Sequence, residues 1–247
     1  MEILGALLAG SFIGAVLGFV GAGGAMLSVP ILIYIFGYTP HHATTAALAV
    51  VFLASLSGAV PKMRLKEVLY RDALVIWGIG LITNLGFSSI SDSLPESFIT
   101  TGFSVVLTVA GISMLRNPFT DTHKRIPVSV LILVSLVIGA MTGLFGIGGG
   151  FLAIPVLVLF FGTPQKVAAG TSLLIISLNS LTALIGHYQL WDQVEWRTPA
   201  LMATSAIYIA QLASRKNSGA SPLAVKKGFS VLLFSVALFT FAKTWWI

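Results

Sequence analysis

Two segments of the chain share one pattern and decide the fold: Gly14–Gly24 reads GAVLGFVGAGG and Gly139–Gly149 reads GAMTGLFGIGG. Pro155 follows Pro30 at the same interval of 125 residues (155 − 30). Chance similarity among small apolar residues is the simpler explanation, but it does not account for an ungapped register that includes a proline. We therefore infer that the chain contains two copies of one structural unit.

The composition places both copies in a membrane. Of the 247 residues, 56% are hydrophobic and 9% are charged, whereas a soluble globular domain has about 25% charged residues. The net charge of +6 also suits nucleic-acid binding, but the basic residues stand in short loops between apolar runs. The chain has no cysteine, which excludes disulfides and thiolate metal sites. We expect a protein surrounded by a lipid bilayer, with no nucleic-acid partner.

The apolar runs predict an all-α, polytopic membrane protein. A membrane-spanning helix needs about 20 apolar residues. Most of the runs are long enough, but the second and the seventh have about 13 residues and reach roughly 20 Å, less than the hydrocarbon core of about 30 Å. We expect these two to be short or broken helices that follow glycine-rich loops. The runs lie at about 3–20, 25–37, 41–60, 73–90, 97–115, 127–146, 150–162, 167–186, 198–213 and 224–243.

The loop charges indicate how the two copies are oriented. Basic loops of membrane proteins face the cytoplasm. In the first copy a mainly basic loop precedes an acidic one, and in the second copy the order is reversed. We therefore predict two inverted-topology repeats of about five segments each, at residues 1–115 and 127–247, with a cytoplasmic linker at 116–126 and both termini outside. The residues are Lys62, Arg64, Lys66 and Arg71, then Asp92 and Glu96; in the second copy they are Asp192 and Glu195, then Arg215, Lys216, Lys226 and Lys227.

The glycine clusters are the first candidate for a substrate site. They comprise Gly21, Gly23 and Gly24 in one copy, and Gly146, Gly148, Gly149 and Gly150 in the other. Broken helices at equivalent places in two inverted repeats indicate a transport site, and a helix start attracts anions through its free N–H groups. Pro30 and Pro155 follow the clusters and are candidate hinges, because proline removes a backbone donor.

The glycines have two other interpretations. The glycines upstream of the clusters form small-xxx-small patterns, which favour close helix packing: Gly10, Gly14 and Gly18 in the first copy, Gly139 and Gly143 in the second. A nucleotide-binding loop is excluded, because no strand precedes either motif and no Lys-Ser or Lys-Thr follows it.

Polar residues on the later segments extend the candidate site. We assign substrate contact to Thr45 and Ser55 in the first copy and to Thr171, Ser172 and Asn179 in the second. The alternative for each hydroxyl is a hydrogen bond to a carbonyl of its own helix. An amide in hydrocarbon must find partners, so Asn179 is the stronger candidate.

Several further polar residues have two open interpretations. Asn84 and Gln211 suit interhelical hydrogen bonding and pore lining equally. His41, His42 and His187 stand at segment ends, where solvation is the favoured interpretation and a proton relay is the alternative.

The two glycine–proline motifs, the Gly170-Thr171-Ser172 run and the duplication resemble the TauE/SafE family of sulfite-exporter-like permeases. The resemblance covers nearly the whole chain. It implies transport of small anions, sulfite and organosulfonates among them, across the bacterial cytoplasmic membrane. The first copy departs from the pattern, because Ala46-Ala47 stands where the second copy has Thr171-Ser172. This departure predicts an asymmetric site.

We therefore predict a transporter that exports a small anion by alternating access, with its site at the midplane where the two glycine loops meet. A gated anion channel on the same scaffold and uptake of a sulfur oxyanion are the alternatives. No His-Glu-x-x-His motif and no membrane-embedded pair of acidic residues is present, so we expect no enzyme, and we expect neither cofactor nor metal. The sequence leaves the oligomeric state open.

Overall fold

A computed structural model of the chain describes residues 2–22, 24–115, 128–145, 153–154, 157, 163–216 and 222–245. Every regular element in these ranges is helical, which confirms the all-α prediction. The helices are α1 (Glu2–Val20), α2 (Gly24–Tyr34), α3 (Pro40–Arg64), α4 (Tyr70–Ile90), α5 (Glu96–Leu115), α6 (Val128–Phe145), α8 (Gln165–Gly186), α9 (Arg197–Lys216) and α10 (Pro222–Trp245), with short 3-10 helices η1 (Ser91–Ser93) and η2 (Tyr188–Gln193). The predicted linker at 116–126 and most of the predicted seventh segment lie outside the described residues.

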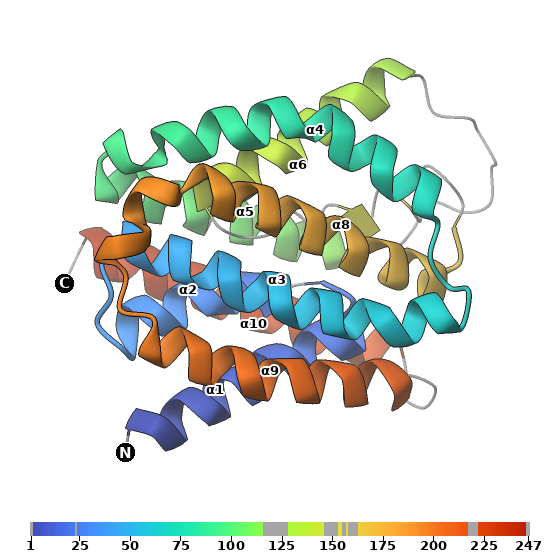
Figure 1. Cartoon of the computed structure of the whole chain (residues 1–247), viewed down its shortest axis with the longest axis horizontal. Helices are drawn as coiled ribbons and strands as arrows, with labels where there is room; N and C mark the ends of the chain where they lie inside the picture. Colours follow the sequence, from blue (N-terminus) through green and yellow to red (C-terminus); the bar gives the residue numbers. More distant parts are fainter. Residues whose placement is uncertain are drawn as a thin grey trace.

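Five of the described helices are long and apolar enough to cross a membrane: α1, α3, α4, α6 and Lys166–Gly186 of α8. The most apolar stretches of α3 and α8 are 67% buried inside the protein, whereas those of the other three are 28–33% buried. Helices α3 and α8 therefore form the centre of the bundle (Figure 1). The other three present most of their surface to the surroundings, as helices in contact with lipid do.

The predicted short second segment is confirmed. Helix α2 has 11 residues, or about 16 Å at 1.5 Å per residue, too few to cross the hydrocarbon core. It is separated from α1 by a break at Gly21, whose φ of +76° is a left-handed conformation that suits glycine. Pro30 lies inside α2, where it removes one backbone donor.

Each of the two outer layers of the bundle pairs one helix of the first copy with one helix of the second. Helix α1 lies along α9 at one edge of the molecule, and α6 lies along α4 at the opposite edge (Figure 1). The glycine contacts show the relative direction of α1 and α9. Gly10 lies against Met202 and Gly18 lies against Ala210, so the two helices run parallel. In the duplication, α6 is the equivalent of α1 and α9 is the equivalent of α4. The α1–α9 layer is therefore equivalent to the α6–α4 layer.

Helices α3 and α8 correspond to each other in the duplication and pack together antiparallel. Thr45, near the start of α3, contacts His187 at the end of α8. At the other end of the pair, a Cβ on Gly170 would lie 3.1 Å from the Cβ of Lys62. Antiparallel packing of equivalent helices is what an inverted repeat requires. The opposite orientation of the two copies across a membrane, with equivalent loops on opposite sides, stays a prediction.

The upstream glycines allow backbones to touch, as the packing interpretation predicts. A Cβ on Gly14 would lie 2.5 Å from the carbonyl oxygen of Ala206 on α9. In the second copy, a Cβ on Gly143 would lie 2.8 Å from the backbone nitrogen of Ser88 on α4. Real Cβ atoms do not approach other atoms so closely, so these contacts require glycine. Such small-residue interfaces provide the van der Waals contact that holds membrane helices together.

Helix α4 offers a matched test of this packing. A Cβ on Gly80 would lie 2.6 Å from the carbonyl oxygen of Ser135, whereas Gly78, two residues earlier, has nothing within 4 Å. We expect Gly80→Leu to destabilise the protein by at least about 2 kcal/mol, because overpacking forces the α4–α6 backbones apart. Gly78→Leu is expected to stay within about 0.5 kcal/mol of the parent. Thermal unfolding in detergent checks both; equal melting temperatures for the two variants would contradict the packing.

Candidate functional site

The first glycine cluster forms the break between α1 and α2 and touches α8. The N–H of Gly21 donates to the carbonyl of Leu17 at 2.8 Å and so closes α1. A Cβ on Gly21 would lie 2.5 Å from the Cβ of Ala169, near the start of α8. Gly24 begins α2 and packs equally closely on α1, because a Cβ on Gly24 would lie 2.6 Å from the carbonyl oxygen of Ile13. The remaining predicted members of the two clusters, Gly23, Gly146, Gly148, Gly149 and Gly150, and the predicted hinge Pro155, lie outside the described residues.

The first cluster and the approach to the second one lie near opposite ends of α8. Gly21 contacts Ala169 at one end, whereas the carbonyl oxygen of Gly143, three residues before the second cluster, lies 3.0 Å from Nε2 of His187 at the other end. Ala169 and His187 are 18 residues apart (187 − 169), or about 27 Å along a helix. The meeting of the two glycine loops at the midplane stays a prediction, because the second cluster lies outside the described residues.

The predicted hydroxyls do not form one cluster. Ser55 donates to carbonyls of its own helix, at 2.6 Å to Val51 and 3.1 Å to Phe52, as the alternative interpretation proposed. Thr171 also bonds within its helix, at 2.7 Å to Val167, but in addition it accepts the N–H of Leu69 at 3.0 Å. Leu69 is the N-cap of α4, so Thr171 joins the start of α4 to the start of α8. Ser172, beside Thr171, is fully buried.

Asn179 meets a second amide at mid-depth. Nδ2 of Asn84 on α4 donates to the backbone oxygen of Asn179 at 2.9 Å and lies 3.3 Å from its Oδ1. The indole N–H of Trp77 and the amide of Asn84 both approach Oγ1 of Thr182, at 3.2 and 3.4 Å. Asn179 lies ten residues from Ala169 and eight from His187 along the helix, and is therefore about midway between the two ends. We call Trp77, Asn84, Asn179 and Thr182 the amide cluster.

The amide cluster contains unused hydrogen-bonding capacity. Both amides are fully buried. Oδ1 of Asn84 and Nδ2 of Asn179 have no hydrogen-bond partner among the described residues. An unpaired buried amide group costs roughly 1–3 kcal/mol. A ligand or water that forms hydrogen bonds with these two atoms removes that cost. The interhelical interpretation of Asn84 is confirmed, and its pore-lining role stays a prediction.

The amide cluster has no counterpart in the other copy. Ala54 occupies the position equivalent to Asn179, at the interval of 125 residues, and is fully buried. The corresponding surface of α3 is packed with small residues, because a Cβ on Gly58 would contact the Cβ of Ala210 at 3.7 Å. Within the described residues, the amide pair is therefore present at only one of the two equivalent places, and the asymmetry of the substrate site stays a prediction.

Two ionisable residues lie in places that the sequence interpretation missed. His187 is 2% exposed rather than solvated at an interface, so that interpretation was wrong. Lys62 belongs to the last turn of α3 rather than to a loop, and its ammonium pairs with Glu67 at 2.8 Å with 4% of the side chain exposed. The two residues are separated by the repeat interval of 125. This shared interval was the signal in the sequence that could have identified them.

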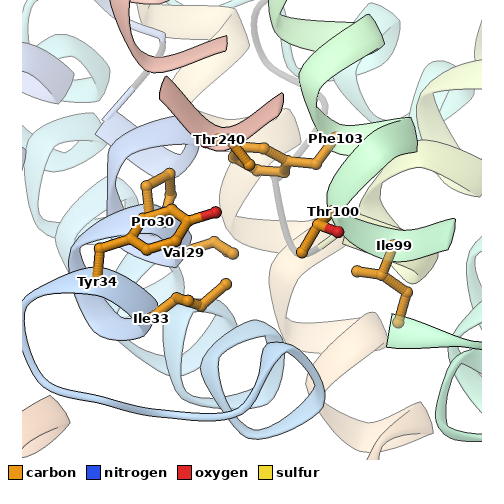
Figure 2. A pocket seen from close by; sticks show the side chains of 8 residues that line it. All are labelled: Val29, Pro30, Ile33, Tyr34, Ile99, Thr100, Phe103 and Thr240. Atoms are coloured by element: carbon orange, nitrogen blue, oxygen red, sulfur yellow. The ribbon is translucent and has the colours of Figure 1, made fainter. Parts of the chain in front are cut away.

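A small cavity lies beside the predicted hinge Pro30. Figure 2 shows Val29, Pro30, Ile33 and Tyr34 of α2 on one side and Ile99, Thr100 and Phe103 of α5 on the other, with Thr240 of α10 closing the space. The lining is apolar apart from a few hydroxyl groups, so the cavity does not suit an anion. It instead leaves α2 incompletely packed at its proline. Within the described residues, no group of three or more His, Asp or Glu side chains is placed to hold a metal ion.

Comparison with known proteins gives a consistent result. Residues 6–240 match the family described as "Sulfite exporter TauE/SafE". A "Probable membrane transporter protein" of Xylella fastidiosa (strain 9a5c) is 27% identical over 96% of this chain and 94% of its own length. The "Probable membrane transporter protein YunE" of Bacillus subtilis is 27% identical over 84% of this chain and 86% of its own. The "Probable membrane transporter protein MJ0441" of Methanocaldococcus jannaschii is 29% identical over 94% and 93%.

The amide cluster makes a testable contribution to stability. We expect Asn84→Leu to lower the free energy of unfolding by about 1–3 kcal/mol, because the change leaves the buried Oδ1 of Asn179 without its donor. Gln211→Leu is the matched control, since Gln211 is a half-buried amide on α9. We expect its effect to be smaller. Thermal unfolding in detergent measures both, and an equal loss in the two variants would argue against a specific amide pair.

Proposed function

The chain belongs to the sulfite exporter TauE/SafE family, and from that premise we propose that it carries a small oxyanion across the cytoplasmic membrane by alternating access. Sulfite and organosulfonates are the proposed substrate class. The observation that carries the proposal is the buried amide cluster, with one unpaired N–H donor and one unpaired acceptor midway between the two ends of α8. The lipid bilayer and the small anion are the proposed partners.

The amide cluster suits an oxyanion that keeps part of its hydration. No Lys, Arg, Asp or Glu stands in the middle third of any described helix. An anion at this depth therefore meets neutral donors such as Nδ2 of Asn179, and it is not held by a fixed counter-charge. Neutral donors bind an anion without trapping it, whereas complete dehydration of a small dianion would be costly. A sulfur oxyanion offers several acceptor oxygens to such a donor.

The two glycine clusters supply the proposed ends of the path. The first cluster stands between α1 and α2, and the second follows the end of α6 in the sequence. The described contacts put Gly21 and Gly143 near opposite ends of α8. We propose that each cluster opens one side of the membrane to the amide cluster, in place of a joint site at the midplane. Pro30 and the cavity beside it allow α2 to move against α5 during this change.

Charge gives the proposed orientation. The end of the bundle that carries Lys62, Arg64 and Lys66 is assigned to the cytoplasm, because basic loops remain inside. Helix α1 begins and α10 ends at the opposite end of the bundle (Figure 1), so we propose that both termini lie outside. Export of an anion is then favoured by the inside-negative potential, by about 2.3 kcal/mol per charge for each 100 mV.

Tracer flux in proteoliposomes tests the proposal. We expect saturable flux of sulfite or a short alkylsulfonate, no comparable flux of acetate, and acceleration by unlabelled substrate on the opposite side. Asn179→Asp is expected to raise the KM about tenfold or more, because it replaces the free N–H donor with an acceptor and a hydrogen bond to a charged ligand contributes roughly 1.5–3 kcal/mol.

Gln211→Glu is the matched control for this substitution, since it makes the same amide-to-acid change on a half-buried face of α9. We expect its KM to stay within about twofold of the parent. An unchanged KM in Asn179→Asp would remove the amide cluster from the site. Unsaturated currents without stimulation from the opposite side would favour a gated channel, and flux that proceeds only inward would favour uptake.

A further inference from the structure

His187 joins four elements at one end of the bundle. It caps the end of α8. Its Nδ1 lies 3.0 Å from Oγ1 of Thr45 on α3. Its Nε2 lies 3.0 Å from the carbonyl oxygen of Gly143 on α6 and 3.2 Å from Oγ of Ser91 in η1. Gly143 stands three residues before the second glycine cluster, so the imidazole lies at the proposed mouth on this side.

The partners of Nε2 require a hydrogen on this nitrogen. The carbonyl oxygen of Gly143 only accepts hydrogen bonds. Ser91 donates its own hydroxyl hydrogen to the carbonyl of Ser88 at 3.0 Å, so its oxygen also accepts from the imidazole. Nε2 is therefore the permanent donor of this histidine, and Nδ1 is the nitrogen whose protonation changes.

The hydroxyl of Thr45 accommodates both states of Nδ1. Its single hydrogen has two acceptors within reach, Nδ1 of His187 at 3.0 Å and the carbonyl oxygen of His41 at 3.1 Å. When Nδ1 is bare, the hydroxyl donates to it. When Nδ1 carries a proton, the hydroxyl turns to His41 and its oxygen accepts from the imidazolium. Proton binding thus costs no hydrogen bond, and it converts the Thr45 contact into a charge-assisted bond of about twice the strength.

The equivalent place in the other copy holds a charge that is already paired. Lys62 corresponds to His187, and Gly170, against which Lys62 packs, corresponds to Thr45. Lys62 pairs with Glu67 at 2.8 Å. Duplication has therefore left a buried ionisable group at each end of the α3–α8 pair, with an ion pair at one end and a histidine at the other.

We propose that His187 is the proton-binding site of the transport cycle: a proton on Nδ1 holds its end of the α3–α8 pair closed, and loss of the proton releases it. This inference rests on the proposed function, because it takes that end to be one of the two mouths. Histidine is the side chain that titrates between pH 5 and 8 without special help. Among the described residues, the equivalent place at the other end holds Lys62, which is paired with Glu67, and no histidine.

Other ionisable residues on the adjoining elements define the controls. Helix α3 carries His41 and His42 in its first turn, η1 contains Asp92, and η2 carries Tyr188 and Asp192 on exposed positions. The described part of α6 has no ionisable residue. His42 is a half-buried histidine in the first turn of α3, the helix that carries Thr45. His42→Gln therefore tests whether loss of another histidine at this end has the same effect.

Single cysteines in this cysteine-free chain measure the opening of each end. Ala43 on α3 and Ala168 on α8 occupy equivalent positions in the two copies, and both are fully buried. We would introduce Ala43→Cys or Ala168→Cys and measure labelling by a membrane-impermeant maleimide between about pH 5.5 and 8.5. Because thiol ionisation itself follows pH, each rate is divided by that of the same cysteine in a His187→Gln background.

We expect labelling at the two cysteine positions to change in opposite directions with pH. Relative labelling at Ala43→Cys falls by about five- to tenfold as the pH drops, because the charge-assisted bond closes that end, and labelling at Ala168→Cys rises. Thr45→Val, which retains the histidine but removes its hydroxyl partner, abolishes the pH dependence, whereas His42→Gln retains it. Each variant is compared only if it elutes as a monodisperse species.

The outcomes separate this inference from the proposed function. If labelling at Ala43→Cys does not change with pH while tracer flux is intact, the His187 proposal is wrong and transport stands. If Ala43→Cys responds and Ala168→Cys does not, the proton site stands and alternating access is contradicted. If His42→Gln removes the response or Thr45→Val leaves it unchanged, the proton binds elsewhere and the proposal is overturned.

Discussion

The close contact of helix backbones at the two outer layers is the constraint on which the rest of the structure depends. Within a bilayer, lipid tails are as apolar as leucine, so helices associate through van der Waals contact and not through exclusion of water. Gly14 against α9 and Gly80 against α6 provide that contact by bringing backbones together. These two layers hold α3 and α8 between them, and all the polar groups of the candidate site lie on or beside this central pair.

The sequence predicted those features that depend on local pattern. The helix segments, the short α2 and the packing glycines follow from hydropathy, from the spacing of glycines and from the duplication. Asn179 was identified as the exceptional polar residue because an isolated amide in an apolar run must find a partner. The partner itself, Asn84, lies 95 residues away, and its position in the sequence suits interhelical bonding and pore lining equally. Its identity depends on how α4 and α8 rotate against each other, which no local pattern encodes.

Burial of ionisable residues near helix ends was the principal error. His187 and Lys62 stand at the ends of apolar runs, where sequence alone favours solvated positions. Both are buried because η1 and the turn after α3 fold back over them: Ser91 reaches the imidazole, and Glu67 reaches the ammonium. A chain of two similar copies makes such groups easier to recognise, since a polar residue repeated at the same interval in both copies is subject to the same packing.

The cavity beside Pro30 gives the molecule a mechanical property. Empty space between α2 and α5 is volume that the protein displaces without filling it with atoms. A conformer in which α2 moves into that space has a smaller partial molar volume, and hydrostatic pressure shifts populations toward the smaller conformer. Hydrostatic pressure therefore favours closer packing of α2 against α5 beside Pro30.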